Sequence, residues 1–350
     1  MKKLLIFVLF LLSCVLCFGQ VETMSDPDYN RQQMGAIGDL KLESGNVISD
    51  CQVGYRTYGH LNKNKSNGIL FPTWFEGSSQ DIEDYATPWR VIDTARYFLI
   101  IVDALGNGVS SSPSNSDLQH GSRFPPFTIR DIVESQYQLL TQILHINRLH
   151  AVIGISMGGM QTFQWGISYP KFADCLIPIV GTPQPSSYDL MGYNVFRKII
   201  EADTAFNHGN YKKNPVIAPA AMLLEFSETT PAFKVRTMSR DSFSVWMHGI
   251  EAAEPPDWND TYYQMVAIVG HDIAKPWKGS LREAANHIKA RMLIISSQQD
   301  HLVNPLPAIA FAKMVPAKLV ILNSDLGHQA PNFGDPVLSK SIVEMLSSEE

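Results

Sequence analysis

Six apolar runs, separated by longer stretches of mixed polarity, constrain the fold of this chain more than any other feature. They are Gly68–Trp74, Tyr97–Leu105, His150–Ser156, Cys175–Gly181, Arg291–Gln298 and Lys318–Ser324. Each run is apolar at successive positions and rich in β-branched residues, which is typical of strands buried on both faces. Alternation of such strands with helical stretches predicts an α/β fold, in which helices flank a mostly parallel central sheet.

Two local patterns add detail to this sheet. Residues Lys41–Gly59, before the first run, consist of short alternating stretches broken by small polar residues, which predicts an antiparallel hairpin. Residues Thr128–His145 carry apolar side chains at helical spacing. Thr128 and Asp131 have the spacing of a capping box, so we expect this helix to begin beside Thr128.

Residues 182–286 interrupt the rhythm of strand and helix. This stretch is rich in methionine, aromatic residues and proline, and it lies between the fourth and fifth apolar runs. We expect it to form helices joined by loops, inserted between two strands of the sheet. Such an insertion predicts a helical cap over the edge of the sheet, and a homodimer built through this cap stays open as an alternative to a monomer.

The N-terminal residues 1–19 have the anatomy of a secretory signal peptide. A lysine pair precedes the apolar run Leu4–Phe18, whose length of about 15 residues is below the roughly 20 that span a bilayer. We therefore expect export to the periplasm or the medium, with cleavage near Gly19 and the α/β domain over residues 20–350. The segment ending at Cys14 also resembles a bacterial lipoprotein box, which would leave the mature protein anchored by a lipid on Cys14.

Charge and cysteine content exclude several classes of partner. The chain has 28 Lys and Arg against 34 Asp and Glu, with no basic stripe, so nucleic acid is not an expected partner. The predicted mature chain keeps two cysteines, Cys51 and Cys175, which an exported protein can hold either as a disulfide or as buried thiols. The predicted mature chain has no CxxC or HExxH spacing that suggests a metal, so we expect no metal site.

The sequence GISMGG, which begins at Gly154, directly follows the apolar residues Leu149–Ile153 and precedes a helical stretch that ends before Pro170. Gly154, Ser156 and Gly158 match the G-x-S-x-G pattern, in which a serine occupies a strained strand-to-helix corner. Glycines flank the serine because the sharp bend brings backbone too close for side chains. The following helix points its first N–H groups at the place where negative charge develops during attack. We therefore interpret Ser156 as a nucleophile rather than part of an ordinary turn.

A serine nucleophile needs a general base and a group that orients this base. With a serine on such a corner, the expected order along the chain is Ser, then Asp or Glu, then His, on loops that follow strands. Asp300 and His328 follow the fifth and sixth apolar runs, so we predict a Ser156–Asp300–His328 triad. The rival residues are His301, the pair His271 and Asp272 in the predicted cap, and Asp325.

Two backbone N–H groups should form an oxyanion hole beside Ser156. One is expected from Met157, the residue after the nucleophile. The other is expected from the loop after the first apolar run, where Trp74 or Phe75 would donate.

Several segments then resemble one known group. The segments GISMGGMQTFQW, FPPFTIRDIV, YGHLN, SQQDHLVNP and GHQAPNF resemble those of homoserine O-acetyltransferase-like proteins in the α/β-hydrolase superfamily. The resemblance implies an α/β-hydrolase fold with the same triad, and an oxyanion hole shaped by Phe75 and Met157. It also implies that Arg197 binds a substrate carboxylate, and Trp74 is expected beside the substrate. The group's chemistry requires no cofactor bound to the protein.

The sequence departs from true acetyltransferases at informative places. An aspartate typically follows their catalytic histidine, whereas Gln329 follows His328 here. An exported protein would also meet no acetyl-CoA. We therefore expect a serine hydrolase of carboxylic esters or related small acyl compounds, acting through an acyl-enzyme on Ser156. The alternatives are an O-acyltransferase of the homoserine O-acetyltransferase type and a non-catalytic binding protein on the same fold. The segment GNGVSS lacks the third glycine of a dinucleotide-binding motif.

Overall fold

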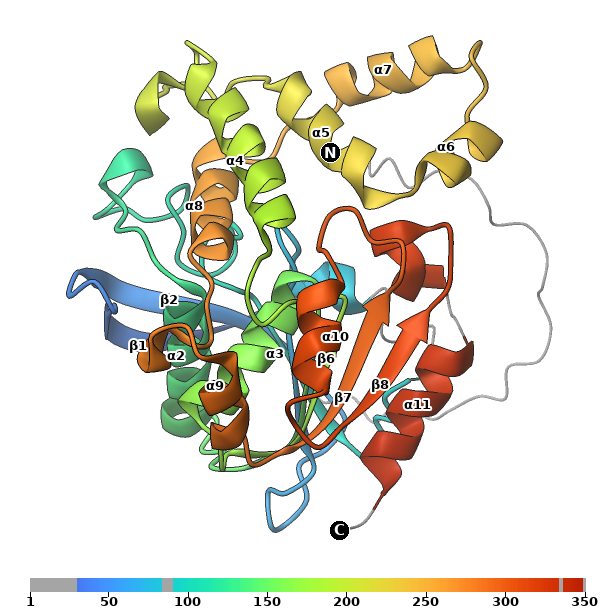
Figure 1. Cartoon of the computed structure of the whole chain (residues 1–350). Coiled ribbons are helices and arrows are strands. Elements are labelled where there is room, and N and C mark those ends of the chain that lie inside the picture. Colours follow the sequence, from blue (N-terminus) through green and yellow to red (C-terminus); the bar gives the residue numbers. More distant parts are fainter. Residues whose placement is uncertain (1–29, 84–90, 334–335, 349–350) are drawn as a thin grey trace, which may run out of the picture.

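A single eight-stranded sheet organises the computed structural model, which describes residues 30–83, 91–333 and 336–348 (Figure 1). The strand order is β1-β2-β4-β3-β5-β6-β7-β8. The strands are β1 (Gln33–Lys41), β2 (Val47–Tyr58), β3 (Gly68–Pro72), β4 (Phe98–Val102), β5 (Leu149–Ile155), β6 (Ala173–Ile179), β7 (Arg291–Ser297) and β8 (Ala317–Leu322). Strand β2 is antiparallel to β1 and to β4, and every other neighbouring pair is parallel.

The predicted α/β fold is confirmed, because each of the six apolar runs overlaps one of the parallel strands β3–β8. Strand β3 shows why these runs are apolar at every position, since all five of its residues are buried. Leu70 packs into the core on one face of the sheet, whereas Ile69 and Phe71 pack into the core on the other face. Both faces of the sheet are therefore covered, and both need apolar side chains.

Helices supply these covers. On one face, the core includes residues of α2 (Ile129–Gln138), α3 (Met157–Ser168), α9 (Leu281–His287) and α10 (Leu306–Ala312). On the other face, it includes residues of α11 (Pro336–Ser347). The predicted capping box is present at the start of α2: the Thr128 N–H donates to Asp131 Oδ2 at 2.8 Å, and the Asp131 N–H donates to Thr128 Oγ1 at 3.2 Å. The α-helix is shorter than predicted, because Leu139–Ile143 form a π-helical turn.

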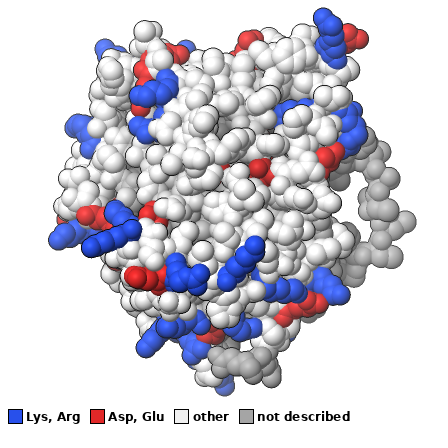
Figure 2. Space-filling model, viewed as in Figure 1, with Lys and Arg blue, Asp and Glu red and all other residues white. Residues whose placement is uncertain are grey.

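The chain between β6 and β7 forms six α-helices, and the first five of them lie above the sheet in Figure 1. They are α4 (Ser187–Ala202), α5 (Ala218–Glu228), α6 (Pro231–Thr237), α7 (Phe243–Ala252) and α8 (Trp258–Val269). The same stretch ends with α9, which packs against α3 and α10. On the face shown in Figure 2, charged side chains gather along the lower edge and the flanks, and the middle of the face is largely uncharged.

Cys51 on β2 and Cys175 on β6 are free and buried, so they do not form a disulfide. Burial raises the pKa of each thiol to about 12. The predicted signal peptide, including Cys14, lies outside the described residues. Within the described ranges, every helix is too short or too polar to cross a bilayer.

Candidate active site

The corner between β5 and α3 holds Ser156 in a conformation that side-chain-bearing residues rarely adopt. Its φ is 57° and its ψ is −119°, and such geometry persists only where the surroundings enforce it. A Cβ atom on Gly154 would lie 2.1 Å from the carbonyl oxygen of Gly158. A Cβ atom on Gly158 would lie 2.6 Å from the carbonyl oxygen of Pro72. The two glycines therefore allow the close backbone approach that the sequence predicts.

The structure brings the three predicted triad side chains together. Ser156 Oγ lies 2.9 Å from His328 Nε2, and His328 Nδ1 lies 2.7 Å from Asp300 Oδ2. Ser156 precedes α3, Asp300 follows β7, and His328 follows β8. These positions meet because the C-terminal ends of parallel strands lie along one edge of a sheet.

Backbone hydrogen bonds fix the carboxylate of Asp300. Its Oδ1 accepts the N–H groups of Leu302 at 2.9 Å and Val303 at 2.8 Å, which leaves Oδ2 for the histidine. The hydroxyl of Tyr193 on α4 donates to the carbonyl oxygen of Leu302 at 2.9 Å. The loop that presents Asp300 is thus held both by its own turn and by the first helix of the insertion.

Opposing effects set the pKa of His328. Burial lowers it, because an imidazolium ion loses hydration. The charge of Asp300, the hydrogen bond to Asp300 and the charge of Glu228 act in the other direction and outweigh burial, so the pKa is raised. Glu228 is the last residue of α5, and its Oε2 accepts a hydrogen bond from Gln329 Nε2 at 3.0 Å. A cap residue therefore contributes to the electrostatics of the candidate base.

We expect Glu228→Gln to shift the acid limb of the kcat/KM profile to lower pH. A general base works in its neutral form, and removing the Glu228 charge removes one of the reasons that His328 holds its proton. The glutamine still offers Gln329 a carbonyl acceptor. Glu225→Gln is the matched control, because Glu225 is also on α5 but its charge raises the pKa of Glu228, whereas the charges that raise the pKa of His328 are those of Asp300 and Glu228. A limb that stays in place in E228Q, or moves to higher pH, would contradict this account.

The loop after β3, residues 73–79 (the oxyanion loop), carries the second predicted oxyanion donor. Among the hydrogen bonds of the described residues, none occupies the N–H group of Phe75 or of Met157. Gln161 on α3 donates from Nε2 to the carbonyl oxygen of Thr73 at 2.9 Å, which ties this loop to the helix that follows the nucleophile. The ring of Phe75 contacts Phe196 on α4 edge to face, with centroids 6.3 Å apart. The roles of Phe75 and Met157 as oxyanion donors stay predictions.

The two predicted substrate-binding side chains have other contacts. Arg197 on α4 contacts Glu201 and the Tyr262 hydroxyl, each at 3.3 Å, so its guanidinium lies at the junction of α4 and α8. The indole of Trp74 lies against its own turn, where a Cβ atom on Gly77 would be 2.4 Å from its Nε1. The contact of Arg197 and of Trp74 with substrate stays a prediction.

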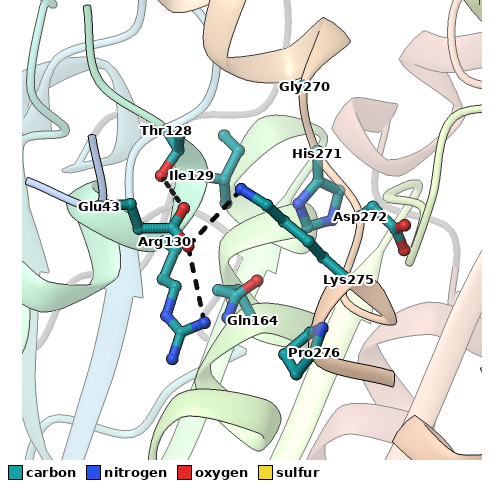
Figure 3. Close-up of a pocket in the computed structure, with 10 residues that line it drawn as sticks. All are labelled: Glu43, Thr128, Ile129, Arg130, Gln164, Gly270, His271, Asp272, Lys275 and Pro276. Atoms are coloured by element: carbon teal, nitrogen blue, oxygen red, sulfur yellow. Dashed lines mark hydrogen bonds and ion pairs between the residues drawn. The ribbon is translucent and has the colours of Figure 1, made fainter. Parts of the chain in front are cut away.

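A separate pocket contains the rival pair His271 and Asp272 (Figure 3). Glu43 also lines this pocket. Its carboxylate accepts a hydrogen bond from the Thr128 hydroxyl at 2.9 Å and forms ion pairs with Arg130 at 3.6 Å and Lys275 at 3.7 Å. His271 is buried with Nε2 3.1 Å from the carbonyl oxygen of Thr182, and burial lowers its pKa to about 4. None of the predicted triad residues lines this pocket, so we do not assign the chemistry to it.

Sequence reasoning missed two acidic residues near the candidate machinery. Glu228 influences His328 from the cap, and Glu76 directly follows Phe75 in the oxyanion loop. Burial is the main cause that raises the pKa of Glu76 to about 7, and the charge of Glu228 adds to this rise. The adjacency of Glu76 to Phe75 was a usable signal, whereas nothing in the sequence placed Glu228 beside His328.

Comparisons with known proteins agree with this geometry. A family model described as the alpha/beta hydrolase fold matches residues 69–331. An ethyl acetate hydrolase of Pseudomonas veronii is 30% identical over 89% of this chain and 94% of its own length. A homoserine O-acetyltransferase of Geotalea daltonii is 30% identical over 83% of this chain and 90% of its own. The crystal structure of the acetyl esterase MekB superposes with a TM-score of 0.85 at 28% identity, covering 93% of this chain and 99% of the esterase.

The matched region contains the strand-to-helix corner and all three of the converging side chains. Its relatives at about 30% identity over most of the chain include both hydrolases and acetyltransferases. This chain is therefore an enzyme of the α/β-hydrolase superfamily and belongs to its homoserine O-acetyltransferase-like branch.

Proposed function

We propose that the chain is an exported serine hydrolase that cleaves small carboxylic esters through an acyl-enzyme on Ser156. The observation that carries this proposal is the continuous hydrogen-bonded series from Ser156 Oγ through His328 to Asp300, at 2.9 and 2.7 Å. This series is the arrangement that turns a weakly nucleophilic hydroxyl into an attacking group.

In the first half of the reaction, His328 Nε2 takes the hydroxyl proton as Ser156 Oγ attacks the ester carbonyl carbon. Asp300 holds the imidazole in the tautomer whose Nδ1 carries a proton, and its charge stabilises the imidazolium that forms. The carbonyl oxygen becomes an oxyanion, to which the N–H groups of Phe75 and Met157 donate. The tetrahedral intermediate collapses, the carbon–oxygen bond to the alcohol breaks, and His328 protonates the departing alkoxide.

In the second half, a water molecule repeats these steps with the acyl-enzyme. His328 accepts a proton from the water, the resulting hydroxide attacks the acyl carbon, and the oxyanion donors stabilise the second intermediate. Ser156 leaves as the alkoxide and recovers its proton from His328. The products are a carboxylic acid and the free enzyme. If an alcohol replaces water in this half, the same residues perform acyl transfer.

Two observations favour water as the acceptor. Gln329 stands where acetyltransferases typically have an aspartate, and its amide donates to Glu228 at 3.0 Å. The relatives also include an ethyl acetate hydrolase and an acetyl esterase whose structures or sequences match most of the chain. The homoserine O-acetyltransferase relatives keep acyl transfer as the second candidate function.

The deciding experiment offers the purified protein both reactions. We expect release of p-nitrophenol from p-nitrophenyl acetate, and no thiol release above background from acetyl-CoA with homoserine. Transfer from acetyl-CoA to homoserine with negligible ester hydrolysis would overturn the hydrolase proposal in favour of acyl transfer. The absence of both reactions, together with no labelling of Ser156 by a fluorophosphonate, would favour the non-catalytic reading.

Export rests on residues 1–19 and has its own test. The full-length chain expressed in a Gram-negative host should appear in the periplasm or medium, with a new N-terminus near Gln20 by mass spectrometry. A lipid-modified N-terminus at Cys14 would show instead that the chain is a lipoprotein. An uncleaved chain confined to the cytoplasm would exclude both.

A further inference from the structure

One residue of the oxyanion loop that the mechanism does not use is hydrogen-bonded to the cap. Glu76 follows Phe75, and its backbone N–H donates to Gln264 Oε1 at 2.8 Å. Its carboxylate accepts a hydrogen bond from the Thr261 hydroxyl. Thr261 and Gln264 are one turn apart on α8, so they lie on the same side of that helix. Two neighbouring side chains of one cap helix thus hold both the backbone and the side chain of Glu76.

Glu76 adopts a backbone conformation that its side chain disfavours. Its φ is 60°, in the left-handed region that glycine enters most readily. A side-chain-bearing residue remains there only where its surroundings enforce the geometry. The contacts to α8 supply that constraint. The hydrogen bond from Thr261 needs a side-chain acceptor, which explains why this position holds a glutamate rather than a glycine.

Helix α8 is itself fixed, so it can hold the loop in place. Gln264 is fully buried, and its Nε2 donates to the carbonyl oxygen of Leu105, in the loop after β4, at 3.0 Å. Asp260, on the same helix, accepts the N–H of Ser114 at 2.9 Å. The amide of Gln264 therefore bridges two loops at the edge of the sheet, and the oxyanion loop is one of them.

The other end of the loop is held by the sheet side of the molecule. The carbonyl oxygen of Gly77 accepts Asn107 Nδ2 at 2.9 Å, and the Ser79 N–H donates to Asp103 Oδ1 at 2.7 Å. Thr73, at the start of the loop, is held by Gln161 at 2.9 Å. Phe75 and Glu76 lie between these two fixed points, in a turn where the Gly77 N–H donates to the carbonyl oxygen of Trp74 at 3.1 Å. That carbonyl shares a peptide plane with the Phe75 N–H, and the contacts to α8 hold the next residue, Glu76.

Glu76 is an exposed residue, although loss of hydration among the surrounding protein atoms is the main cause that raises the pKa of its carboxylate. The charge of Glu228 on α5 adds to the rise of this pKa, and the Thr261 hydrogen bond opposes the rise by favouring the charged form.

We propose that Glu76 is a positioning residue, which couples the cap helix α8 to the oxyanion hole by aiming the Phe75 N–H at the tetrahedral intermediate. The proposal rests on the proposed function of Ser156 and Phe75. It predicts that breaking the contact between Glu76 and Thr261 weakens binding of the transition state and leaves ground-state binding of the ester unchanged.

The test compares Thr261→Val, Glu76→Gly and Glu76→Gln with the wild type. Valine matches threonine in shape but cannot donate, glycine relaxes the left-handed backbone but has no acceptor, and glutamine keeps a carbonyl acceptor. We expect T261V and E76G to lower kcat for p-nitrophenyl acetate about tenfold with KM within twofold. This loss is smaller than the roughly 10²- to 10³-fold loss on removing an oxyanion donor outright. E76Q should retain most of the activity, and the double variant T261V/E76G should lose no more than E76G.

An inhibitor that forms a tetrahedral adduct with Ser156 distinguishes a positioning role from a purely structural one, because its inhibition constant depends on the oxyanion hole. A methyl trifluoromethyl ketone adds Ser156 Oγ to its carbonyl carbon, and the resulting oxyanion occupies the hole. Its inhibition constant should rise in T261V by the same factor by which kcat falls. The matched control is Thr237→Val on α6, whose hydroxyl donates to the Phe233 carbonyl oxygen within its own helix at 2.8 Å. T237V should match the wild type in both measurements.

Several outcomes would overturn the proposal: a T261V enzyme as active as T237V, a defect confined to KM, or an unchanged inhibition constant for the ketone. E76G tests the same contact from the loop side if T261V fails to fold. A wild-type protein that neither hydrolyses the ester nor binds the ketone would overturn the proposed function, and this inference with it. An active wild type with unaffected variants overturns this inference alone.

Discussion

Replacing Ser156 with alanine should lower kcat/KM for p-nitrophenyl acetate by about 10⁵- to 10⁶-fold, because removing the nucleophile of a serine triad leaves only binding and the oxyanion hole. The Oγ that lies 2.9 Å from His328 Nε2 would be gone. Labelling by a fluorophosphonate should disappear in the same variant. The fold should survive, since the change removes one atom from a residue that is only partly buried.

Ser168→Ala is the matched control for this prediction. Ser168 ends the same helix that Ser156 precedes, and its hydroxyl accepts Gln164 Nε2 at 2.9 Å. S168A should keep activity within about twofold of the wild type. If S156A kept a hundredth or more of the wild-type activity, Ser156 could not be the nucleophile and the acyl-enzyme mechanism would be wrong.

The second large effect concerns stability. Gly154→Ala should lower the free energy of unfolding by about 3 kcal/mol or more, because its Cβ would lie 2.1 Å from the carbonyl oxygen of Gly158. That neighbour is backbone and cannot rotate away, so β5 and α3 would have to separate at the corner. Urea denaturation followed by tryptophan fluorescence measures the loss, and activity should fall with it as Ser156 is displaced.

Gly192→Ala tests whether this cost belongs to the corner or to any glycine. Gly192 is inside α4, and a Cβ atom there would meet nothing within 4 Å. Alanine is favoured over glycine in a helix interior by about 1 kcal/mol, so G192A should be as stable as the wild type or slightly more. Equal unfolding midpoints for G154A and the wild type would contradict the steric argument.

The sheet and the converging side chains could be predicted because short-range patterns and chain order determine them. A strand buried on both faces must be apolar throughout, as Gly68–Pro72 is, so each such strand is visible in the sequence. Parallel strands place their C-terminal ends along one edge, so the residues that follow three of them are expected to meet. Ser156, Asp300 and His328 do meet there.

The cap and the contacts it makes could not be predicted in this way. A helix pattern shows which side of α8 is buried, but not which loop it faces. Thr261 contacts Glu76 across 185 residues of sequence. Glu228 acts on His328 from a separate helix, through a contact that depends on how α5 packs. Such pairings arise from tertiary packing among helices whose own sequences are compatible with many arrangements.

The two buried free thiols can be used to detect where the sheet opens. Cys51 lies on β2 and Cys175 on β6, on either side of the β4–β3–β5 centre, and both are closed to solvent. A thiol reagent reaches either sulfur only when the strands around it part. Comparing the labelling rates of the two single-cysteine variants of the predicted mature chain would therefore show which half of the sheet separates first under stress, without adding any label site to the protein.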